Sequence, residues 1–436
     1  MTNRLSTTQE ALMNTKLSRR DFLSTFASGI AYMGVRTPDW YPRFTFFAPQ
    51  NVGPRGDVLV CIFQRGAMDG INVVIPYTES DYYKLRPTLA IPEPKTGNDK
   101  TIINLDGKFG LHPSLRPFKE IWDAKQLAPI HAAGSPDPTH SHFDAMDYME
   151  RGTPGEKQIP TGWLARHLQT VAWENKSPFR AVGMGTLLQT SLRGPVSATS
   201  LQSIAEFHLG GRNRSDPIKQ FQSAISQMYS GSSPLDQSAS LTLQATDMLE
   251  KVNVGTYKPA NNAAYPKGNF GTALMQVAQL IKAEVGLEIA AVDLGGWDTH
   301  VRQGALDGDM PDLLAELSQG LAALYKDLGD AMKKVTIVTM SEFGRRVAEN
   351  GGGGTDHGHG NVMFVIGGGV NGGKVYGDWP GIGKDKLDGP GDLAITTDFR
   401  DVLGEIVQKR MLNDKLSEVF PNYSKFKMRD VLQKLT

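Results

Sequence analysis

Three short runs of apolar and β-branched residues constrain the fold of this chain most strongly. They read DVLVCIF at residues 57–63, LEIAAVDL at 287–294 and VTIVTM at 335–340. Continuous apolar runs of this length are typical of strands that are buried on both faces. Helical patterns precede the last two runs, at 273–284 and 313–332. This alternation predicts a largely parallel α/β sheet with helices on both faces.

The rest of the chain fits the same plan, apart from one stretch in its middle. Residues 190–268 are rich in Ser, Gln and Asn, so we expect a polar, mostly helical insertion there that caps the sheet. A further apolar run occupies 71–75. Additional strands are predicted at 127–133 and 361–366, and additional helices at 115–125, 143–151, 163–174 and 398–410.

Composition excludes several classes of protein. Lys and Arg together number 46, as do Asp and Glu, whereas a general nucleic-acid-binding protein needs a strong positive field. The single cysteine, Cys61, excludes an intrachain disulfide and a cysteine-rich zinc or iron–sulfur site. No run of about 18 apolar residues is present, so no ordinary membrane-spanning helix is expected.

The first forty residues have the plan of an export signal. Residues 18–23 read SRRDFL, and a short apolar stretch, FLSTFASGIAYMG, follows at 22–34. Adjacent arginines followed by Phe and Leu resemble the twin-arginine (Tat) signal. We therefore expect a signal and linker at 1–45 and one domain at 46–436, with the Tat translocase as a transient partner and the periplasm or cell envelope as the destination. The alternative is a basic helix on the surface of the domain.

Five of the nine histidines lie in three polar loops beside predicted strands. The loops read PTHSHFD at 138–144, GGWDTH at 295–300 and GTDHGHG at 354–360, and a fourth loop, RGAMDG, follows the first strand at 65–70. Parallel strands end at one edge of a sheet, where ligands bind in such folds. The loops are therefore expected to converge, the third of them through the turn at 341–346.

Aspartate and histidine at close spacing suit Zn, Mn, Mg or Fe. Asp298 and His300 are two residues apart, so in an extended loop their side chains point the same way. Asp356, His357 and His359 offer further ligands from a glycine-rich loop. Each motif alone is also compatible with a simple turn, or with a pair of residues that contacts metal ligands without binding the metal itself. Three such loops at equivalent places favour a metal or anion site.

Ser141 is the candidate nucleophile. It precedes an apolar-periodic segment and has Asp144 three residues later, which is the pattern of a helix N-cap, so a purely structural role is also open. A helix N-terminus favours phosphate or sulfate, and a hydroxyl beside a divalent ion could attack such an ester. Thr139 is the rival nucleophile. Arg345 and Arg346 could bind an anionic substrate group or form a surface ion pair.

Several of these segments together resemble the DUF1501 family, which comprises uncharacterised bacterial proteins often exported by Tat. The matching segments are RGAMDG, SHFDAMDY, GGWDTH, SEFGRR and GTDHG, and the likeness covers about residues 57–425. The family in turn is similar to the alkaline phosphatase and sulfatase superfamily. The resemblance implies a three-layer α/β/α sandwich that hydrolyses phosphate or sulfate esters with one or two divalent ions, Zn, Mn, Mg or Ca.

The resemblance also implies roles for individual residues. It makes Ser141 the nucleophile, with His142 beside it as a second catalytic residue. Asp69, which follows the first strand, becomes a metal ligand. The further metal ligands implied are Asp298 and His300 for one ion and Asp356 and His357 for the other, with His359, His140 or His142 in place of a later histidine that this chain lacks.

Three functions are therefore weighed. The first is an exported metal-dependent hydrolase of a small-molecule or polysaccharide phosphate or sulfate ester. The second is a non-catalytic envelope protein with a degenerate site that binds a glycan or a partner. The third is an exported oxidoreductase with an iron site made of two histidines and one carboxylate.

Overall fold

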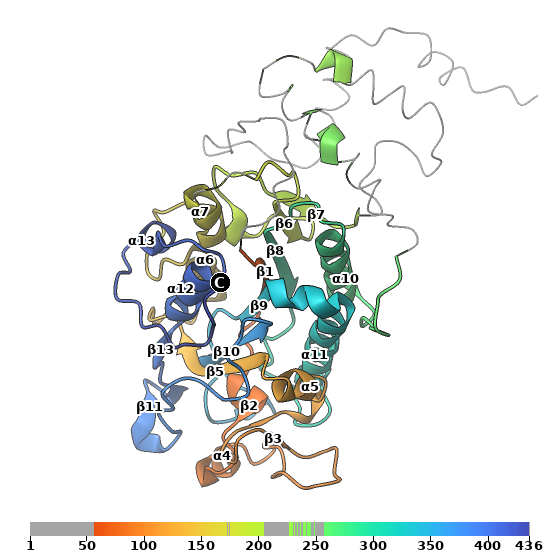
Figure 1. Cartoon of the computed structure of the whole chain (residues 1–436). Coiled ribbons are helices and arrows are strands. Elements are labelled where there is room, and N and C mark those ends of the chain that lie inside the picture. Colours follow the sequence, from red (N-terminus) through yellow and green to blue (C-terminus); the bar gives the residue numbers. More distant parts are fainter. Residues whose placement is uncertain are drawn as a thin grey trace, which may run out of the picture.

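The computed structural model describes residues 56–435, except 172, 174, 205–225 and some positions between 230 and 256. The expected Tat signal at 1–45 therefore lies outside the described residues. An eight-stranded sheet forms the centre of the molecule (Figure 1). Its strand order is β13 (Thr397–Asp398), β5 (Leu127–Gly134), β10 (Asn361–Gly367), β9 (Val335–Met340), β1 (Val58–Gln64), β8 (Ile289–Leu294), β6 (Ala181–Met184) and β7 (Thr199–Leu201).

The sheet is parallel except at one strand. β1 pairs in parallel with β8 and β9, and β6 continues the parallel run to β7. β10 runs antiparallel to both of its neighbours, β9 and β5. The start of β10 therefore lies at the edge where its neighbours end. The prediction of a largely parallel sheet is confirmed, and the reversed β10 is an exception that the sequence pattern did not indicate.

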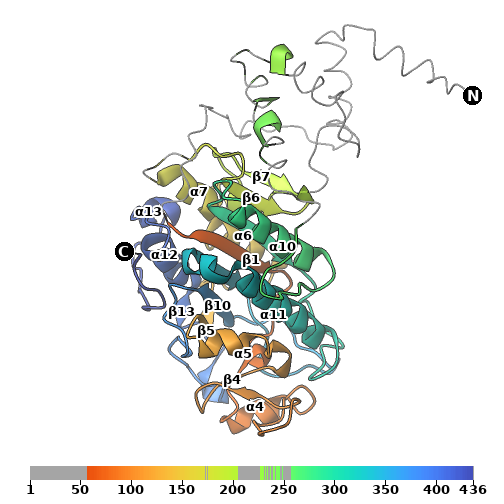
Figure 2. The same ribbon diagram turned by 45° about the vertical axis from the view of Figure 1, so that its right-hand side comes forward.

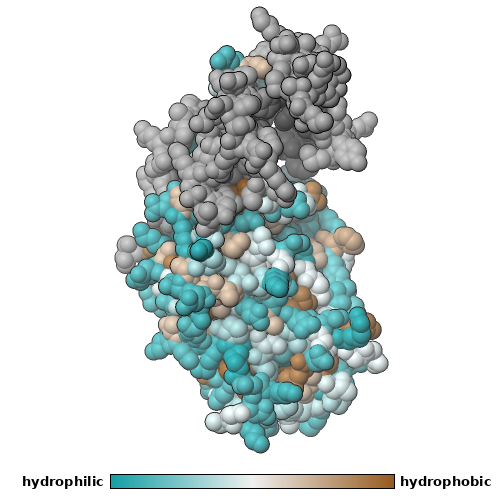
Figure 3. Space-filling view, turned by 90° about the vertical axis from the view of Figure 1, so that its right-hand side faces the viewer, coloured by the Kyte–Doolittle hydropathy of each residue, from teal (hydrophilic) through white to brown (hydrophobic). Residues whose placement is uncertain are grey.

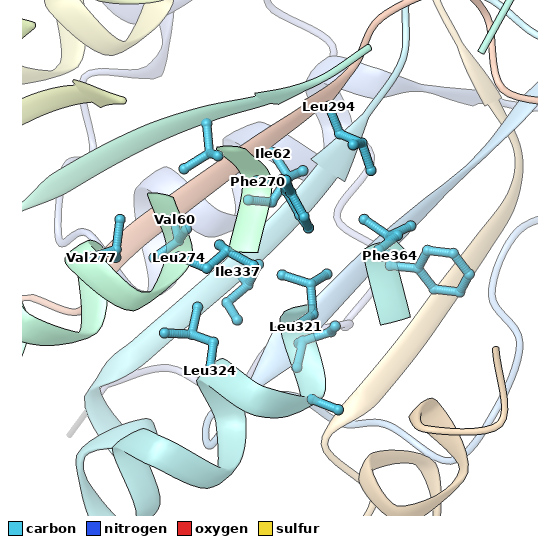
Figure 4. Close-up of a cluster of buried hydrophobic side chains, with 14 of the residues drawn as sticks. Val60, Ile62, Phe270, Leu274, Val277, Leu294, Leu321, Leu324, Ile337 and Phe364 are labelled. Atoms are coloured by element: carbon cyan, nitrogen blue, oxygen red, sulfur yellow. The ribbon is translucent and has the colours of Figure 1, made fainter. Parts of the chain in front are cut away.

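Alternate side chains of β1 enter two separate cores, as expected for a strand buried on both faces. Val60 and Ile62 join a core beneath α5 (Phe118–Asp123), α10 (Asn269–Lys282) and α11 (Asp309–Leu328). Figure 4 shows these two residues meeting side chains of α10 and α11. Leu59 and Cys61 join the opposite core, beneath α7 (Trp163–Thr170), α12 (Phe399–Lys409) and α13 (Leu416–Val419). The predicted three-layer α/β/α sandwich is thus confirmed (Figures 1 and 2).

The helices form because their apolar residues recur on one face. In α11 five leucines recur at intervals of three or four residues and are buried in the core, whereas Asp312, Gln319 and Lys326 are exposed on the other side of the helix. Burying one such side chain stabilises the fold by about 1.5–3 kcal/mol. The buried leucines of this stripe are Leu314, Leu317, Leu321, Leu324 and Leu328.

Smaller elements surround the sheet. The apolar run at 71–75 forms a short helix followed by a short strand, and a three-stranded sheet of order β2-β4-β3 covers one end of the molecule. These elements are α3 (Gly70–Val73), β2 (Val74–Ile75), α4 (Ser80–Leu85), β3 (Ile103–Asn104), β4 (Gly110–Leu111), η1 (Pro113–Leu115), α6 (His142–Arg151), η2 (Thr190–Leu192), η5 (Gly329–Lys334), η6 (Lys384–Lys386), β11 (Leu387–Asp388) and β12 (Asp392–Leu393).

The expected insertion at 190–268 is described only in part. Its first residues form η2 and β7, so they extend the sheet rather than cap it with helices. Much of the remainder lies outside the described residues, and a helical insertion there stays a prediction. No helix in the described part of the chain is long and apolar enough to cross a bilayer. On the face shown in Figure 3 apolar side chains are scattered among polar ones.

Candidate metal centre

Four loops meet at one edge of the sheet. Two of them follow the parallel strands β1 and β8, and a third joins the end of β5 to α6. The loop between β9 and β10 both leaves and re-enters the sheet at this edge, because β10 is reversed. The polar residues of these loops therefore come together although they lie far apart in the sequence.

Glycines allow the loops to approach one another closely. A Cβ atom on Gly354 would lie 2.3 Å from the backbone oxygen of Thr299. A Cβ atom on Gly66, whose φ is +118°, would lie 2.6 Å from the backbone nitrogen of Asp298. Neither position can hold a larger residue unless the backbone moves. Gly354, Gly358 and Gly360 thus serve close packing of this glycine-rich loop, whereas Gly351 and Gly353 have open space around them.

His142, Asp298 and His357 form a compact triad. Their ligand atoms all lie within 4.8 Å of one another. The Nε2 atoms of His142 and His357 are 3.0 Å apart, and they lie 3.4 and 3.3 Å, respectively, from Oδ1 of Asp298. The Nε2 atom of His300 lies 2.9 Å from that of His357 and 3.2 Å from the same aspartate oxygen. We call these four residues the His/Asp cluster.

Each histidine of the cluster has an acceptor at its other ring nitrogen. Nδ1 of His142 lies 2.7 Å from Oε1 of Glu342, and Nδ1 of His357 lies 3.0 Å from the backbone oxygen of His140. Nδ1 of His300 lies 3.3 Å from Oδ1 of Asp356. A neutral ring that carries its proton on Nδ1, toward these acceptors, keeps a lone pair on Nε2. In that state the lone pairs of His142 and His357 lie beside a carboxylate oxygen of Asp298, and Nε2 of His300 lies next to His357.

This donor set fits a divalent metal ion. Ligand atoms about 2.0–2.1 Å from a tetrahedral zinc ion lie about 3.3 Å from one another. The triad separations of 3.0, 3.3 and 3.4 Å agree with that spacing. Histidine ligands in metal sites usually donate their second N–H group to a carboxylate or a carbonyl oxygen, as all three do here.

Charges around the cluster favour its metal-binding protonation state. Burial acts to raise the pKa of Asp298, but the hydrogen bond and charge of Arg345 outweigh it and lower that pKa to about 2. Burial, followed by the charge of Arg345, lowers the pKa of His357. The hydrogen bond to Glu342 raises the pKa of His142, so protons compete there with a cation. Metal ligands must be deprotonated, and two of these three groups are held in that state.

Arg345 connects three of the loops from the interior of the protein. Its side chain is fully buried, and Nη2 donates to Oδ1 of Asp298 at 2.6 Å. The same guanidinium donates to backbone oxygens of three loops, those of Gly66, Ala67, Trp297 and Thr355. The interpretation of Arg345 as a surface ion pair or an anion-binding residue is therefore wrong, because no face of its side chain is exposed.

Three of the predicted metal ligands lie outside the cluster. Asp69 is buried, and its carboxylate pairs with Arg86, with Nη2 and Oδ1 2.9 Å apart, while Gln303 donates to Oδ2 at 2.6 Å. His359 binds backbone oxygens of the loop after β5 through Nε2. Asp356 contacts Nδ1 of His300, whereas the cluster is formed by Nε2 of that ring, so the Asp356 carboxylate is not part of the cluster. The carboxylate of Asp69 and Nε2 of His359 thus contact protein groups away from the cluster, and their assignment as ligands stays a prediction.

Ser141 is the N-cap of α6, as its pattern predicted. Its Oγ accepts the N–H of Asp144 at 3.5 Å, which is a long hydrogen bond. His142 follows it directly as the first residue of the helix and joins the cluster. The resemblance had placed His142 as a catalytic residue or a substitute ligand, and the geometry favours the ligand.

Sequence reasoning missed Glu342, which is fully buried behind His142. Its Oε1 also accepts the N–H of Gly66 at 2.8 Å, and Ser341 donates to its Oε2. The available signal was its position directly after the end of β9, where a parallel α/β sheet places its ligand-binding residues.

Comparisons with known proteins identify a family and distant structural likenesses. Residues 57–415 match the family described as "Protein of unknown function (DUF1501)". No curated protein matches the chain significantly.

Solved structures similar to this chain include three proteins of the alkaline phosphatase and sulfatase kind. The zinc complex of the C-terminal periplasmic domain of EcEptC from Escherichia coli is 11% identical, with 75% of this chain and 76% of that chain covered and a TM-score of 0.34. The 2-O GAG sulfatase BT1596 is 9% identical over 86% and 72%, with a TM-score of 0.36. An alkaline phosphatase from the Antarctic bacterium TAB5 is 10% identical over 72% and 92%, with a TM-score of 0.28. These TM-scores are too low for the activity of any of the three proteins to be assigned to this chain.

Proposed function

The chain belongs to the DUF1501 family, and we propose that it is an exported metal-dependent hydrolase of phosphate or sulfate esters. One observation carries the proposal: two imidazoles and a carboxylate, those of His142, His357 and Asp298, lie together at the edge of the sheet, with a third imidazole, His300, beside them. The twin-arginine pattern at residues 19–20 supports export.

The cluster supplies the means for ester hydrolysis. A bound divalent ion would polarise the ester and stabilise negative charge on the transferring group. Arg345 keeps Asp298 anionic, and Glu342 and Asp356 orient the rings of His142 and His300. Ser141 remains the proposed nucleophile, because its hydroxyl precedes His142 directly and is held only by a long hydrogen bond from Asp144. Thr139 remains the rival.

Metal analysis combined with ester turnover tests the proposal. We expect the purified protein to bind Zn or Mn and to hydrolyse an aryl phosphate or an aryl sulfate. His357→Ala should lose both metal and turnover, because His357 contributes a lone pair to the cluster. His359→Ala is the matched control: it removes a histidine of the same loop that binds only backbone oxygens, and it should keep the metal.

A further variant separates chemistry from metal binding. Ser141→Ala should keep its metal and lose turnover at least about a hundredfold if Ser141 is the nucleophile. Its helix would lose about 1 kcal/mol of capping. Metal retained by His357→Ala would refute the assigned cluster. Metal bound by the wild type without turnover of any ester would favour the non-catalytic binding protein instead.

One observation favours the oxidoreductase as the second candidate. The compact triad consists of two histidines and one aspartate, which is the donor set of non-haem iron(II) oxygenases. Iron in the purified protein, together with oxygen consumption, would support that function. The histidine His300 argues against it, because a third imidazole beside the triad takes up a position that such sites leave open.

A further inference from the structure

We infer that the substrate carries an apolar group, and that this group packs on the exposed side chains of Phe143 and Val301 beside the His/Asp cluster. This inference rests on the proposed function and adds to it the chemical class of the substrate, an ester with a charged group at one end and a hydrocarbon or aromatic group at the other. It begins from where the exposed apolar side chains lie.

Large exposed apolar side chains gather at the edge of the sheet that carries the cluster. Five such side chains are exposed in the described part of the chain, and four of them follow β5, β6 or β8. These strands run parallel to β1 and therefore end at the same edge. Exposed apolar residues are common when scattered, so the informative observation is their concentration at one edge. The four are Phe143, Leu187, Val301 and Leu306.

Two of these side chains directly follow residues of the cluster. Phe143 comes after His142, and Val301 comes after His300. Nε2 of His142 and Nε2 of His300 lie 3.0 and 2.9 Å from Nε2 of His357, so the segments that carry the two apolar residues meet at the cluster. Because consecutive Cα atoms are only about 3.8 Å apart, both apolar residues lie beside the cluster.

Phe143 has no structural use for its ring. It is the second residue of α6, and it is 90% exposed. The first turn of a helix favours acidic side chains, such as the neighbouring Asp144, over apolar ones. The buried face of α6 is formed instead by Ala145, Tyr148 and Met149. The Phe143 ring thus adds little to folding, and an apolar ligand would remove it from water.

Val301 is fixed in position although its side chain is 57% exposed. The backbone oxygen of the preceding residue, His300, accepts from Nδ2 of Asn350 at 3.0 Å. A Cβ atom on Gly352 would lie 3.1 Å from Cγ1 of Val301, so the neighbouring loop packs against one side of this side chain. A contact residue held in place before binding loses little conformational entropy when a ligand arrives.

The combination of the cluster and these two side chains selects the ligand. Asp298 and His300 are partly exposed, so a charged group can reach the cluster from solvent. An apolar group attached to it would then cover Phe143 and Val301. Two side chains suit one small group, whereas a stable protein interface covers about 800 Å² on each partner. Each buried CH₂ group would strengthen binding about fourfold.

Phosphonate binding to the zinc-loaded protein tests the inference without relying on turnover, because a phosphonate has no ester bond to break. We expect the wild type to bind hexylphosphonate or phenylphosphonate at least about tenfold more tightly than methylphosphonate, measured by calorimetry. The hexyl and phenyl compounds separate an aliphatic from an aromatic substrate group.

Substitution of the apolar residues should remove this preference. Phe143→Ser should weaken binding of the preferred phosphonate at least about fivefold and bind methylphosphonate like the wild type, because the cluster is left intact. Val301→Ser should have a smaller effect in the same direction. Leu412→Ser is the matched control and should keep the full preference. Leu412 is 37% exposed and lies two residues after Arg410, which pairs with Asp57 before the start of β1, at the opposite edge of the sheet.

Two results would overturn the inference: a wild type that prefers neither hexylphosphonate nor phenylphosphonate to methylphosphonate, or a preference that is unchanged in Phe143→Ser. The proposed function fails separately. A preference that depends on Phe143, with no ester hydrolysed, would refute the hydrolase and leave the apolar contact intact. Equal hydrolysis of methyl, hexyl and phenyl phosphate by the wild type and by Phe143→Ser would do the reverse.

Discussion

At the scale of single residues, hydrogen bonds at one ring nitrogen decide what the other nitrogen can do. His142, His300 and His357 each meet an oxygen acceptor at Nδ1, so a neutral ring with its proton there presents a lone pair at Nε2. His112 and His131 have the opposite arrangement, because a backbone N–H donates to their Nδ1 and Nε2 faces a carbonyl oxygen. We therefore propose a ligand role for the histidines of the loops, whereas His112 and His131 have a structural role in the core.

Among the acceptors at Nδ1 of the three loop histidines, Glu342 lies nearest to its ring nitrogen. Its substitution therefore gives a testable prediction. We expect Glu342→Gln to weaken metal affinity by about 10–100-fold, because His142 loses the charged partner that orients its ring. Zinc titration with a competing chelator would measure the change. Glu349→Gln is the control, because Glu349 lies in the same loop but accepts backbone N–H groups of Thr88 and Leu89. Equal zinc affinity in Glu342→Gln and Glu349→Gln would contradict the role of Glu342.

At the scale of elements, the loops act as packed units rather than as flexible tethers. Gly354 packs against the backbone of Thr299 and His300, and Gly358 packs against that of Arg345. The loop between β9 and β10 is thereby pressed onto the loop after β8. This contact, rather than any regular secondary structure, holds His357 beside Asp298.

The glycine contacts predict a large difference between two neighbouring substitutions. Gly354→Ala should weaken zinc binding and lower the melting temperature, because its Cβ would lie 2.3 Å from a backbone oxygen. Gly351→Ala should change neither, since no atom lies within 4 Å of the position of its Cβ. Differential scanning fluorimetry with and without zinc measures both effects. Similar behaviour of the two variants would show that the loops are not closely packed.

At the scale of the whole molecule, buried histidines make stability depend on pH. Burial lowers the pKa of His112 and of His131 to about 4, below the value of about 6.5 in an unfolded chain. The unfolded state therefore binds protons first as the pH falls, and stability present above about pH 6.5 is lost toward pH 4. We expect each histidine to lower the free energy of unfolding by about 2 kcal/mol between pH 7 and pH 5.

Urea unfolding at the two pH values measures this loss. His131→Asn should lose about 2 kcal/mol less than the wild type over the same interval, because it lacks one of the titrating groups. The comparison is made within each protein, so the lower stability of the variant at pH 7 does not affect it. An identical loss of unfolding free energy in both proteins would show that His131 does not contribute to the pH dependence of stability.

Much of the architecture was predictable from the sequence, because burial patterns are local. The strands at 57–63, 287–294 and 335–340 and most helices form within a few residues of the predicted bounds. A continuous run of apolar residues indicates a strand that is buried on both faces. The strand direction of β10 was not predictable in this way, since its apolar run reads the same in either direction.

Local sequence patterns were enough to predict which segments form strands and helices, that helices cover both faces of the sheet, and which loops carry histidine and aspartate. The folded chain was needed to show that Asp69 pairs with Arg86, that His359 contacts backbone oxygens, and that His142 lies beside Asp298. Side-chain partners lie far apart along the chain, as do His142 and Glu342, which are separated by 200 positions. Periodicity is set by neighbouring residues, whereas the partner of a charged or imidazole group is set by which loops the folded sheet brings together.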